Sequence, residues 1–120
     1  MAGKKISSLE KRLLAQKAEI FKAIGHPLRL AILEFIKDGE KTVSEITEFV
    51  GSEQSNVSRH LAVLKQTGIV DCRKDGLNVY YYLKIRCILN ATVCMDSVLR
   101  TQMETQSELL DLLESSKKLK

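Results

Sequence analysis

Residues 45–67 constrain the fold most, because a glycine there separates two segments of helical length. A short helix is predicted over 45–50 with Ser44 as its N-cap. A longer helix follows Gly51, with Ser52 as its N-cap. A short helix, a tight glycine turn and a second helix of this length together predict a helix-turn-helix.

The longer helix combines an apolar stripe with an unusual polar face. Val57, Leu61 and Leu64 recur at helical spacing and form the stripe. The opposite face carries short hydrogen-bonding side chains, whereas a plain exposed helix favours Glu and Lys. Such side chains can reach phosphates and base edges in a major groove. The candidate DNA contacts on this helix are Gln54, Ser55, Asn56, Ser58, Arg59, His60 and Lys65. The alternative is an ordinary solvated helix surface.

A β-hairpin is predicted directly after this helix. Val70 and Cys72 alternate with polar residues, Asp75-Gly76 is a two-residue turn signal, and a second strand is expected over 78–83. Because a two-stranded hairpin is unstable alone, it must pack on the helices. Its tip offers Arg73, Lys74 and Asn78 as contacts to a phosphate backbone. We interpret the hairpin as a wing; a capping hairpin with a solvated tip is the alternative.

The segment Gly25-His26-Pro27 separates two further helices, predicted over about 8–24 and 28–37. Pro27 suits the first turn of a helix, where its missing N–H would have no partner. His26 is expected to have a structural role at this corner. Ser7 with Glu10 reads as a capping box at the start of the first helix.

A long last helix is predicted over about 85–115. This helix and the first, about 8–24, carry more apolar surface than the core at about 28–83 can cover, so a partner subunit is expected to cover it. We therefore predict a single mainly α (α+β) winged helix-turn-helix domain over 1–120 that forms a homodimer. Two such units would reach successive major grooves about 34 Å apart.

The distribution of charge permits a polyanionic partner such as double-stranded DNA but does not require one. The net charge is +4 and the pI is about 9.0; residues 52–86 hold six basic against three acidic residues, and residues 87–120 hold four against five. No apolar run is long enough for a membrane span or a signal peptide, so we expect a cytoplasmic protein without a membrane partner. Its three cysteines are then free thiols. We see no catalytic motif and expect no enzyme.

Four parts of the sequence match a known family pattern: Phe21–Leu33, Gln54–Leu61 with Leu64, Gly68–Val70, and Gly76 with Val79–Tyr81. Together they resemble the ArsR/SmtB family of winged-helix repressors. It spans about residues 21–83 and implies four helices, a hairpin and a fifth helix. It further implies a homodimer joined by the first and last helices. The fourth helix and the wing would read DNA, and the protein would repress an operator with inverted repeats.

Many members of that family release DNA when a metal, metalloid or oxidant binds, but several of their sensing patterns are missing here. Residues 42–46 lack the Cys-x-Cys of the third-helix thiolate site, and no histidine follows His60 to build the last-helix zinc site. The second helix lacks the cysteine of persulfide-type members. Some arsenite-type members place their thiols in the last helix, so a thiol-reactive inducer such as arsenite or a soft metal is the prediction.

The candidate ligand thiols are Cys87 and Cys94, with Cys72 as a further candidate. In one continuous helix the Cα atoms of Cys87 and Cys94 would lie about 10.5 Å apart. That exceeds the roughly 7 Å that a disulfide tolerates, and a single ion would need another thiol. Cys72 is expected to be a small buried residue. The alternatives are structural cysteines, redox or sulfur sensing, a repressor without an inducer, and a winged-helix module for protein contacts.

Overall fold

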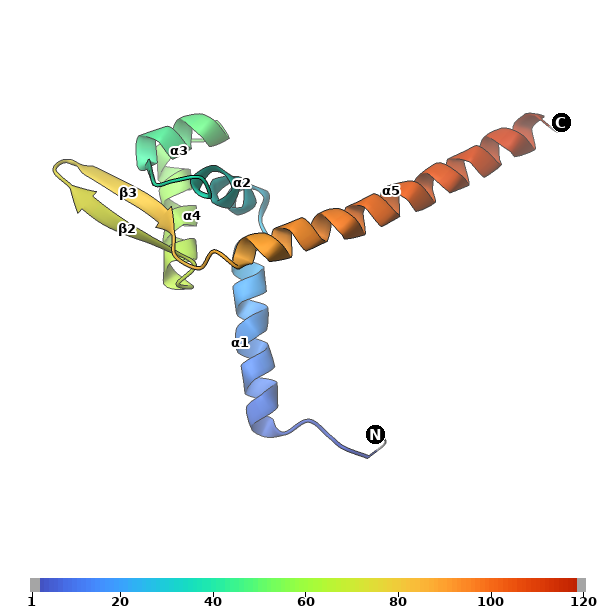
Figure 1. Cartoon of the computed structure of the whole chain (residues 1–120), viewed down its shortest axis with the longest axis horizontal. Helices are drawn as coiled ribbons and strands as arrows, with labels where there is room; N and C mark the ends of the chain where they lie inside the picture. Colours follow the sequence, from blue (N-terminus) through green and yellow to red (C-terminus); the bar gives the residue numbers. More distant parts are fainter. Residues whose placement is uncertain (1–2, 119–120) are drawn as a thin grey trace. The chain divides into compact units, whose positions relative to one another are not determined.

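The computed structural model describes residues 3–118 and confirms a helix-rich α+β architecture (Figure 1). The helices are α1 (Ser8–Ile24), α2 (Pro27–Ile36), α3 (Val43–Val50), α4 (Gln54–Gln66) and α5 (Ile88–Lys118), and the strands are β1 (Lys41–Thr42), β2 (Val70–Asp75) and β3 (Asn78–Leu83). The chain divides after Arg86 into two compact units, which are described separately. Residues 1–2 and 119–120 of the predicted domain lie outside the described residues.

The core of the first unit lies between α2, α3, α4 and the sheet. In Figure 1 these three helices gather together and the β2–β3 hairpin extends from them. The largest fully buried side chains are Ile32, Leu33, Ile36, Ile46, Val57, Leu61, Leu64 and Val70. The apolar stripe predicted on α4 is therefore confirmed, and its burial directs the polar face of α4 outward.

The sheet has three strands, one more than the predicted hairpin. β3 pairs antiparallel with β2, with Cys72 opposite Tyr81, and pairs antiparallel with β1 on its other side, with Thr42 opposite Tyr80. The short strand β1 was not predicted, because two residues are too few to show a strand period. A tight hairpin turn is confirmed, but it lies one residue later than predicted: Asp75 ends β2 opposite Asn78, so the two turn residues are Gly76, at φ 64°, and Leu77.

The N-cap of α3 is Thr42, so the prediction of Ser44 is wrong. The Glu45 backbone N–H donates to Thr42 Oγ1 (3.2 Å), and the Thr42 backbone N–H donates to the Glu45 carboxylate (3.0 Å). This capping box satisfies two donors at the helix start. The bond from the Thr42 backbone, and then that from its hydroxyl, lower the pKa of Glu45.

The predicted Ser52 cap of α4 is also wrong. Glu53 occupies the N-cap position and makes no side-chain cap bond, while Ser52 Oγ accepts a hydrogen bond from Asn56 Nδ2 (2.9 Å). The first backbone N–H groups of α4 are thus left without a side-chain acceptor from the N-cap.

Ser7 is the N-cap of α1, as predicted, because the Glu10 backbone N–H donates to Ser7 Oγ (3.1 Å). The Glu10 carboxylate accepts from the Ser7 hydroxyl (3.1 Å) and not from the Ser7 backbone N–H, so the predicted capping box is only half formed. Its buried residues are confined to its C-terminal end, Ala23 and Ile24. The exposed apolar residues of α1 are Leu9, Leu13, Leu14, Ile20 and Phe21, at 39–74%. Within the first unit, the N-terminal part of α1 points away from the other helices (Figure 1).

Helix α5 begins at Ile88, three residues later than predicted, so Cys87 lies in the turn that precedes it. The Asn90 backbone N–H donates to the Cys87 carbonyl (3.1 Å). The assumption that one continuous helix contains both Cys87 and Cys94 is therefore wrong. No helix in the described part of the chain is long and apolar enough to cross a membrane.

We expect Thr42→Ala to lower the free energy of unfolding by about 1 kcal/mol, because α3 loses its N-cap hydroxyl. Ser44→Ala is the matched control, because Ser44 is exposed and lies two residues after the N-cap, inside α3. Urea unfolding followed by circular dichroism measures both. A larger loss for Ser44→Ala than for Thr42→Ala would contradict the cap assignment.

Candidate nucleic-acid interface

The outward face of α4 presents a group of polar side chains at its N-terminal half. Gln54, Ser55, Ser58 and Arg59 are all exposed, and Lys65 is exposed two turns further on. Because the N-cap offers no side-chain acceptor, the backbone N–H groups of the first turn remain able to bind an anion. Hydroxyl, amide and guanidinium groups are thus brought together where a helix can approach a nucleic acid.

Asn56 has a different environment from the one predicted. Its side chain is half-buried, its Nδ2 donates to Ser52 Oγ (2.9 Å), and its Oδ1 accepts from an Arg59 guanidinium N–H (2.9 Å). Both ends of the amide are therefore used inside the protein. Asn56 orients Arg59, which still has N–H groups directed to solvent, so Arg59 is the better placed of the two for an external contact.

His60 lies on the flank of α4 that faces the α1–α2 corner. Its Nδ1 accepts a hydrogen bond from Arg29 Nε (3.1 Å), and its ring centroid lies 4.4 Å from that of His26. Burial lowers the pKa of His60, and the neighbouring charges of His26, Arg29 and Arg59 lower it further. The predicted DNA contact would thus come from a half-buried ring that is already bonded within the protein.

The predicted structural role of His26 is confirmed. Its side chain is the N-cap of α2, with Nδ1 accepting from the Leu28 backbone N–H (3.1 Å), and Pro27 occupies the first turn.

On the wing, Arg73 is already paired within the protein, whereas Lys74 is available to bind an external group. Arg73 makes a bidentate ion pair with Glu40, through Nε to Oε2 (2.8 Å) and through a second N–H to Oε1, and it lies 4.7 Å over the Tyr80 ring. This hydrogen bonding lowers the pKa of Glu40. Lys74 is exposed and forms no ion pair with any described residue. Lys74 is therefore the wing cation that is free to meet a phosphate.

The tip of the wing holds one residue that the sequence analysis did not single out. Leu77, between Gly76 and the exposed Asn78, is fully exposed. A large apolar residue inside a tight hairpin turn was the available signal, because such turns favour Gly, Asn and Asp.

The three cysteines do not form a metal centre within one chain. Cys87 and Cys94 are exposed, Cys72 is half-buried, and no three His, Cys, Asp or Glu side chains among the described residues are placed to hold an ion. Interaction with the Cys72 side chain raises the pKa of Lys65. Because Cys72 is half-buried, the prediction of a buried Cys72 is wrong.

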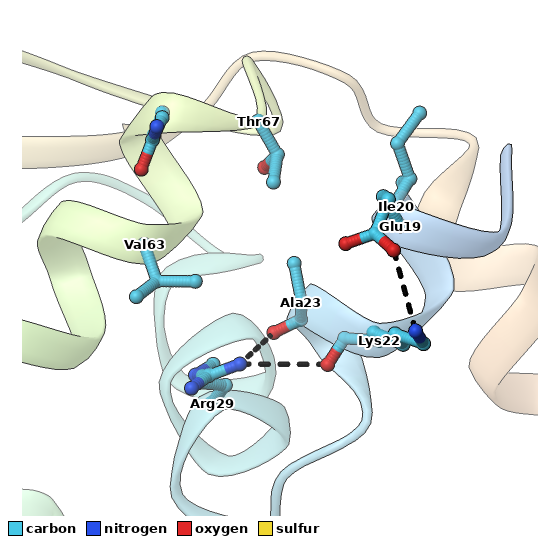
Figure 2. Close-up of a pocket in the computed structure, with 8 residues that line it drawn as sticks. Glu19, Ile20, Lys22, Ala23, Arg29, Val63 and Thr67 are labelled. Atoms are coloured by element: carbon cyan, nitrogen blue, oxygen red, sulfur yellow. Dashed lines mark hydrogen bonds and ion pairs between the residues drawn. The ribbon is translucent and has the colours of Figure 1, made fainter. Parts of the chain in front are cut away.

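A pocket of about 450 Å³ separates the C-terminal end of α1 from the C-terminal half of α4 (Figure 2). Its lining residues are Glu19, Ile20, Lys22, Ala23, Arg29, Val63, Gln66 and Thr67. Within it, an Arg29 guanidinium N–H donates to the carbonyls of Ala23 (2.8 Å) and Lys22 (3.4 Å). Sequence reasoning did not single out Arg29, because the spacing within α2 says nothing about which helix its side chain reaches.

Comparison with known proteins places this geometry in a family. Residues 26–71 match the family model described as "Bacterial regulatory protein, arsR family". An uncharacterized HTH-type transcriptional regulator of Mycobacterium tuberculosis is 42% identical over 66 residues, which are 54% of this chain and 58% of that protein. The chain thus matches little more than half the length of that relative.

Other relatives are covered more fully. The transcriptional repressor SdpR of Bacillus subtilis is 35% identical over 79 residues, 66% of this chain and 81% of SdpR. A solution structure from Mycobacterium bovis is described as a homodimeric winged helix-turn-helix DNA-binding domain and a possible ArsR-family transcriptional regulator. It has a TM-score of 0.71 and 30% identity, covering 88% of this chain and 95% of that one.

The M. tuberculosis and B. subtilis relatives are described as transcriptional regulators and the M. bovis domain as a possible one, in agreement with the expectation that the chain is not an enzyme. The family match, the winged helix-turn-helix fold and the extent of the aligned sequence agree. The chain belongs to the ArsR family of bacterial regulatory proteins.

Proposed function

We propose that the protein is a homodimeric repressor that binds double-stranded DNA in the cytoplasm, at an operator with inverted repeats. The observation that carries this proposal is the exposed polar face of α4, which stands beside a wing with a free cation, Lys74. The related Mycobacterium bovis domain, described as homodimeric and DNA-binding, and the B. subtilis repressor support it.

Two kinds of contact follow from the side chains on this surface. Gln54 and Ser58 are exposed near the start of α4, and amide and hydroxyl groups can bond base edges in a major groove. Arg59 and Lys74 carry charge and suit phosphates. Arg73 would have to leave Glu40 to contact DNA, so we assign it to the internal support of the wing.

We expect Gln54→Ala to lose sequence discrimination, by about 1–3 kcal/mol for a lost base contact. Gel-shift titrations on operator and on random DNA measure it, with Glu10→Gln on α1 as a control variant away from the interface. An equal loss on both DNAs would remove the base-reading assignment from Gln54.

We expect Lys74→Ala to weaken binding to every sequence alike and to reduce the salt dependence by about one phosphate contact. The matched control is Glu40→Ala/Arg73→Ala, which removes an internal ion pair without changing the net charge. Its salt slope should equal that of the wild type. If the double variant lowers the salt dependence of DNA affinity and Lys74→Ala does not, then Arg73 contacts the phosphate and Lys74 does not. A wild-type protein with no salt-dependent DNA binding would favour the protein-interaction alternative.

The homodimer is proposed from apolar surface that each unit leaves exposed. On α1 this surface includes Leu9, Leu13 and Phe21. On α5 the exposed apolar residues are Val93, Met95, Val98, Leu99, Met103, Leu109, Leu110, Leu112 and Leu113. Apolar patches of this extent are uncommon on monomers, and a second copy of the chain is the partner proposed to cover them.

We expect the full chain to sediment as a dimer at micromolar concentration. Leu109→Glu/Leu113→Glu should shift it toward monomer, because a buried interface would have to accept two carboxylates. Ser107→Glu/Ser115→Glu places the same number of charges on the opposite face of the same helix and controls for charge alone. Sedimentation equilibrium that finds a soluble wild-type monomer would contradict the proposal.

We further propose that a thiol-reactive inducer binds Cys87 and Cys94 and thereby causes the protein to release DNA. Both thiols are exposed, so a reagent or soft ion can reach them. Among the described residues of one chain, no three ligand side chains gather, so a three-thiolate site would have to draw thiols from both protomers. The inducer would act only through its different affinities for the DNA-binding and released states.

We expect arsenite, a thiophilic divalent ion or an oxidant to weaken operator binding by the wild type, and Cys87→Ser/Cys94→Ser to remove that response. DNA titrations with each reagent measure it, with Cys72→Ser as the matched thiol control. If every reagent acts equally on the wild type and on the double variant, these cysteines are not the sensing residues.

A further inference from the structure

The C-terminal end of α1 and the recognition helix α4 are joined through a polar bridge rather than by close packing along their lengths. The pocket described above lies between them (Figure 2). Arg29, from α2, reaches in both directions: one guanidinium N–H donates to the α1 carbonyls of Ala23 and Lys22, and Nε donates to His60 of α4. A cation at the carbonyl end of a helix is also favoured by the helix dipole.

This bridge depends on unprotonated imidazole nitrogens. His60 Nδ1 accepts from Arg29, and His26 Nδ1 accepts from the Leu28 backbone N–H, so in both rings the acceptor is the nitrogen that a proton would occupy. The two rings lie 4.4 Å apart. Protonation of His60 would replace an acceptor with a donor facing Arg29 and would place a second cation beside the first.

We propose that Arg29 and His60 are positioning residues that hold α4 against α1 in a proton-sensitive bridge, with His26 as its third member. Acidification would break the bridge and move the recognition helix out of its DNA-binding position. This inference rests on the proposed DNA-binding function, and it assigns His60 to the alignment of α4 instead of to direct contact with DNA.

The charges around His60 act in the same direction. The groups that lower its pKa after burial are His26, Arg29 and, on its own helix, Arg59. On α1 the nearest charged residues of the pocket are Lys22 and Glu19, which pair with each other (3.3 Å). The other elements packed on α4 carry Glu45 and Glu48 on α3, and Asp71, Arg73, Lys74 and Asp75 on β2. No carboxylate is among the causes of the His60 shift.

The sign of the pH effect follows from the lowered pKa. An unfolded histidine takes up a proton near pH 6.5, whereas folded His60 does so only at lower pH. As the pH falls below about 6.5, the unfolded state therefore binds more protons than the folded state. The free energy of unfolding decreases over this pH range. Above it, this contribution to stability is fully present.

The proposed alignment role of His60 and a direct contact of His60 with DNA predict opposite effects of acidification on DNA affinity, so an experiment can distinguish them. If His60 touched a phosphate or a base acceptor, its protonation would add a positive donor and strengthen DNA binding at low pH. If His60 accepts from Arg29 to align α4, its protonation weakens binding.

The test compares operator affinity at about pH 8 and about pH 5.5, at constant ionic strength, for the wild type, His60→Asn, His26→Asn and the double variant. Asparagine keeps a side-chain acceptor near the Nδ1 position but does not titrate in this range. We expect the wild type to lose about tenfold in affinity on acidification, the size of one charge-assisted hydrogen bond, and His60→Asn to lose much less. The double variant contains no histidine and gives the baseline, since the chain has only two.

Arg29→Lys supplies a second measurement. Lysine keeps the charge but lacks the fork that bridges two helices. We expect weaker operator binding with an unchanged salt slope, because Arg29 meets no phosphate in this role.

The outcomes separate the inference from the proposed function. Affinity that rises on acidification, or a pH effect that survives in His60→Asn, overturns the bridge while leaving DNA binding intact. A reduced salt slope in Arg29→Lys overturns it as well. Absence of wild-type DNA binding at both pH values contradicts the proposed function. In that case the free energy of unfolding still tests the bridge: its fall between pH 8 and pH 5.5 must be smaller in His60→Asn than in the wild type.

Discussion

Burial of the apolar stripe of α4 is the interaction on which the rest of the first unit depends. Val57, Leu61 and Leu64 are completely buried against α2, α3 and the sheet. A helix anchored along one stripe has its rotation about its own axis determined. The exposure of Gln54, Ser58 and Arg59 follows from that rotation, as does the placement of His60 at the α1–α2 corner. The same apolar contacts therefore position the surface proposed for DNA and the bridge that orients it.

Polar contacts inside the protein divide the candidate residues into those that are free and those that are already bonded. Asn56, His60 and Arg73 each bond another side chain, whereas Gln54, Ser58 and Lys74 face solvent. A bonded residue can still matter to recognition by holding a neighbour in place, as Asn56 does for Arg59. This division assigns alignment and contact to different side chains of one helix. It also explains why a basic residue on a wing need not contribute to phosphate binding.

The two long helices raise a separate question, because their apolar residues remain exposed in each unit. The hydrophobic effect favours covering such surface, and a second copy of the chain would supply an identical one. The carbonyl end of α1 is held by Arg29, which in turn bonds His60 on α4. A change at a dimer interface that includes α1 would thus have a short covalent and hydrogen-bonded route to the recognition helix.

The sequence by itself determined the helix-rich α+β class, the helix-turn-helix, the presence of a tight hairpin turn at Gly76 and the buried stripe of α4. These features arise from local spacing and turn chemistry, which the residue order carries directly. The positions of Gln54, Ser55, Ser58, Arg59 and Lys74 on exposed surfaces follow from the same periodicity. The sequence missed β1 and the caps at Thr42 and Glu53, since a two-residue strand has no period and several nearby residues could serve as caps.

Only the tertiary structure decided which partner each long polar side chain meets. Arg73 bonds Glu40 and Arg29 bonds His60 across more than thirty residues of sequence, and no local pattern encodes such pairs. Likewise, the start of α5 at Ile88 separates Cys87 from the helix that periodicity had assigned to it. Local order determines the elements and their faces; contacts between elements distant in sequence form only after those faces have packed, and they determine which side chains remain free to act.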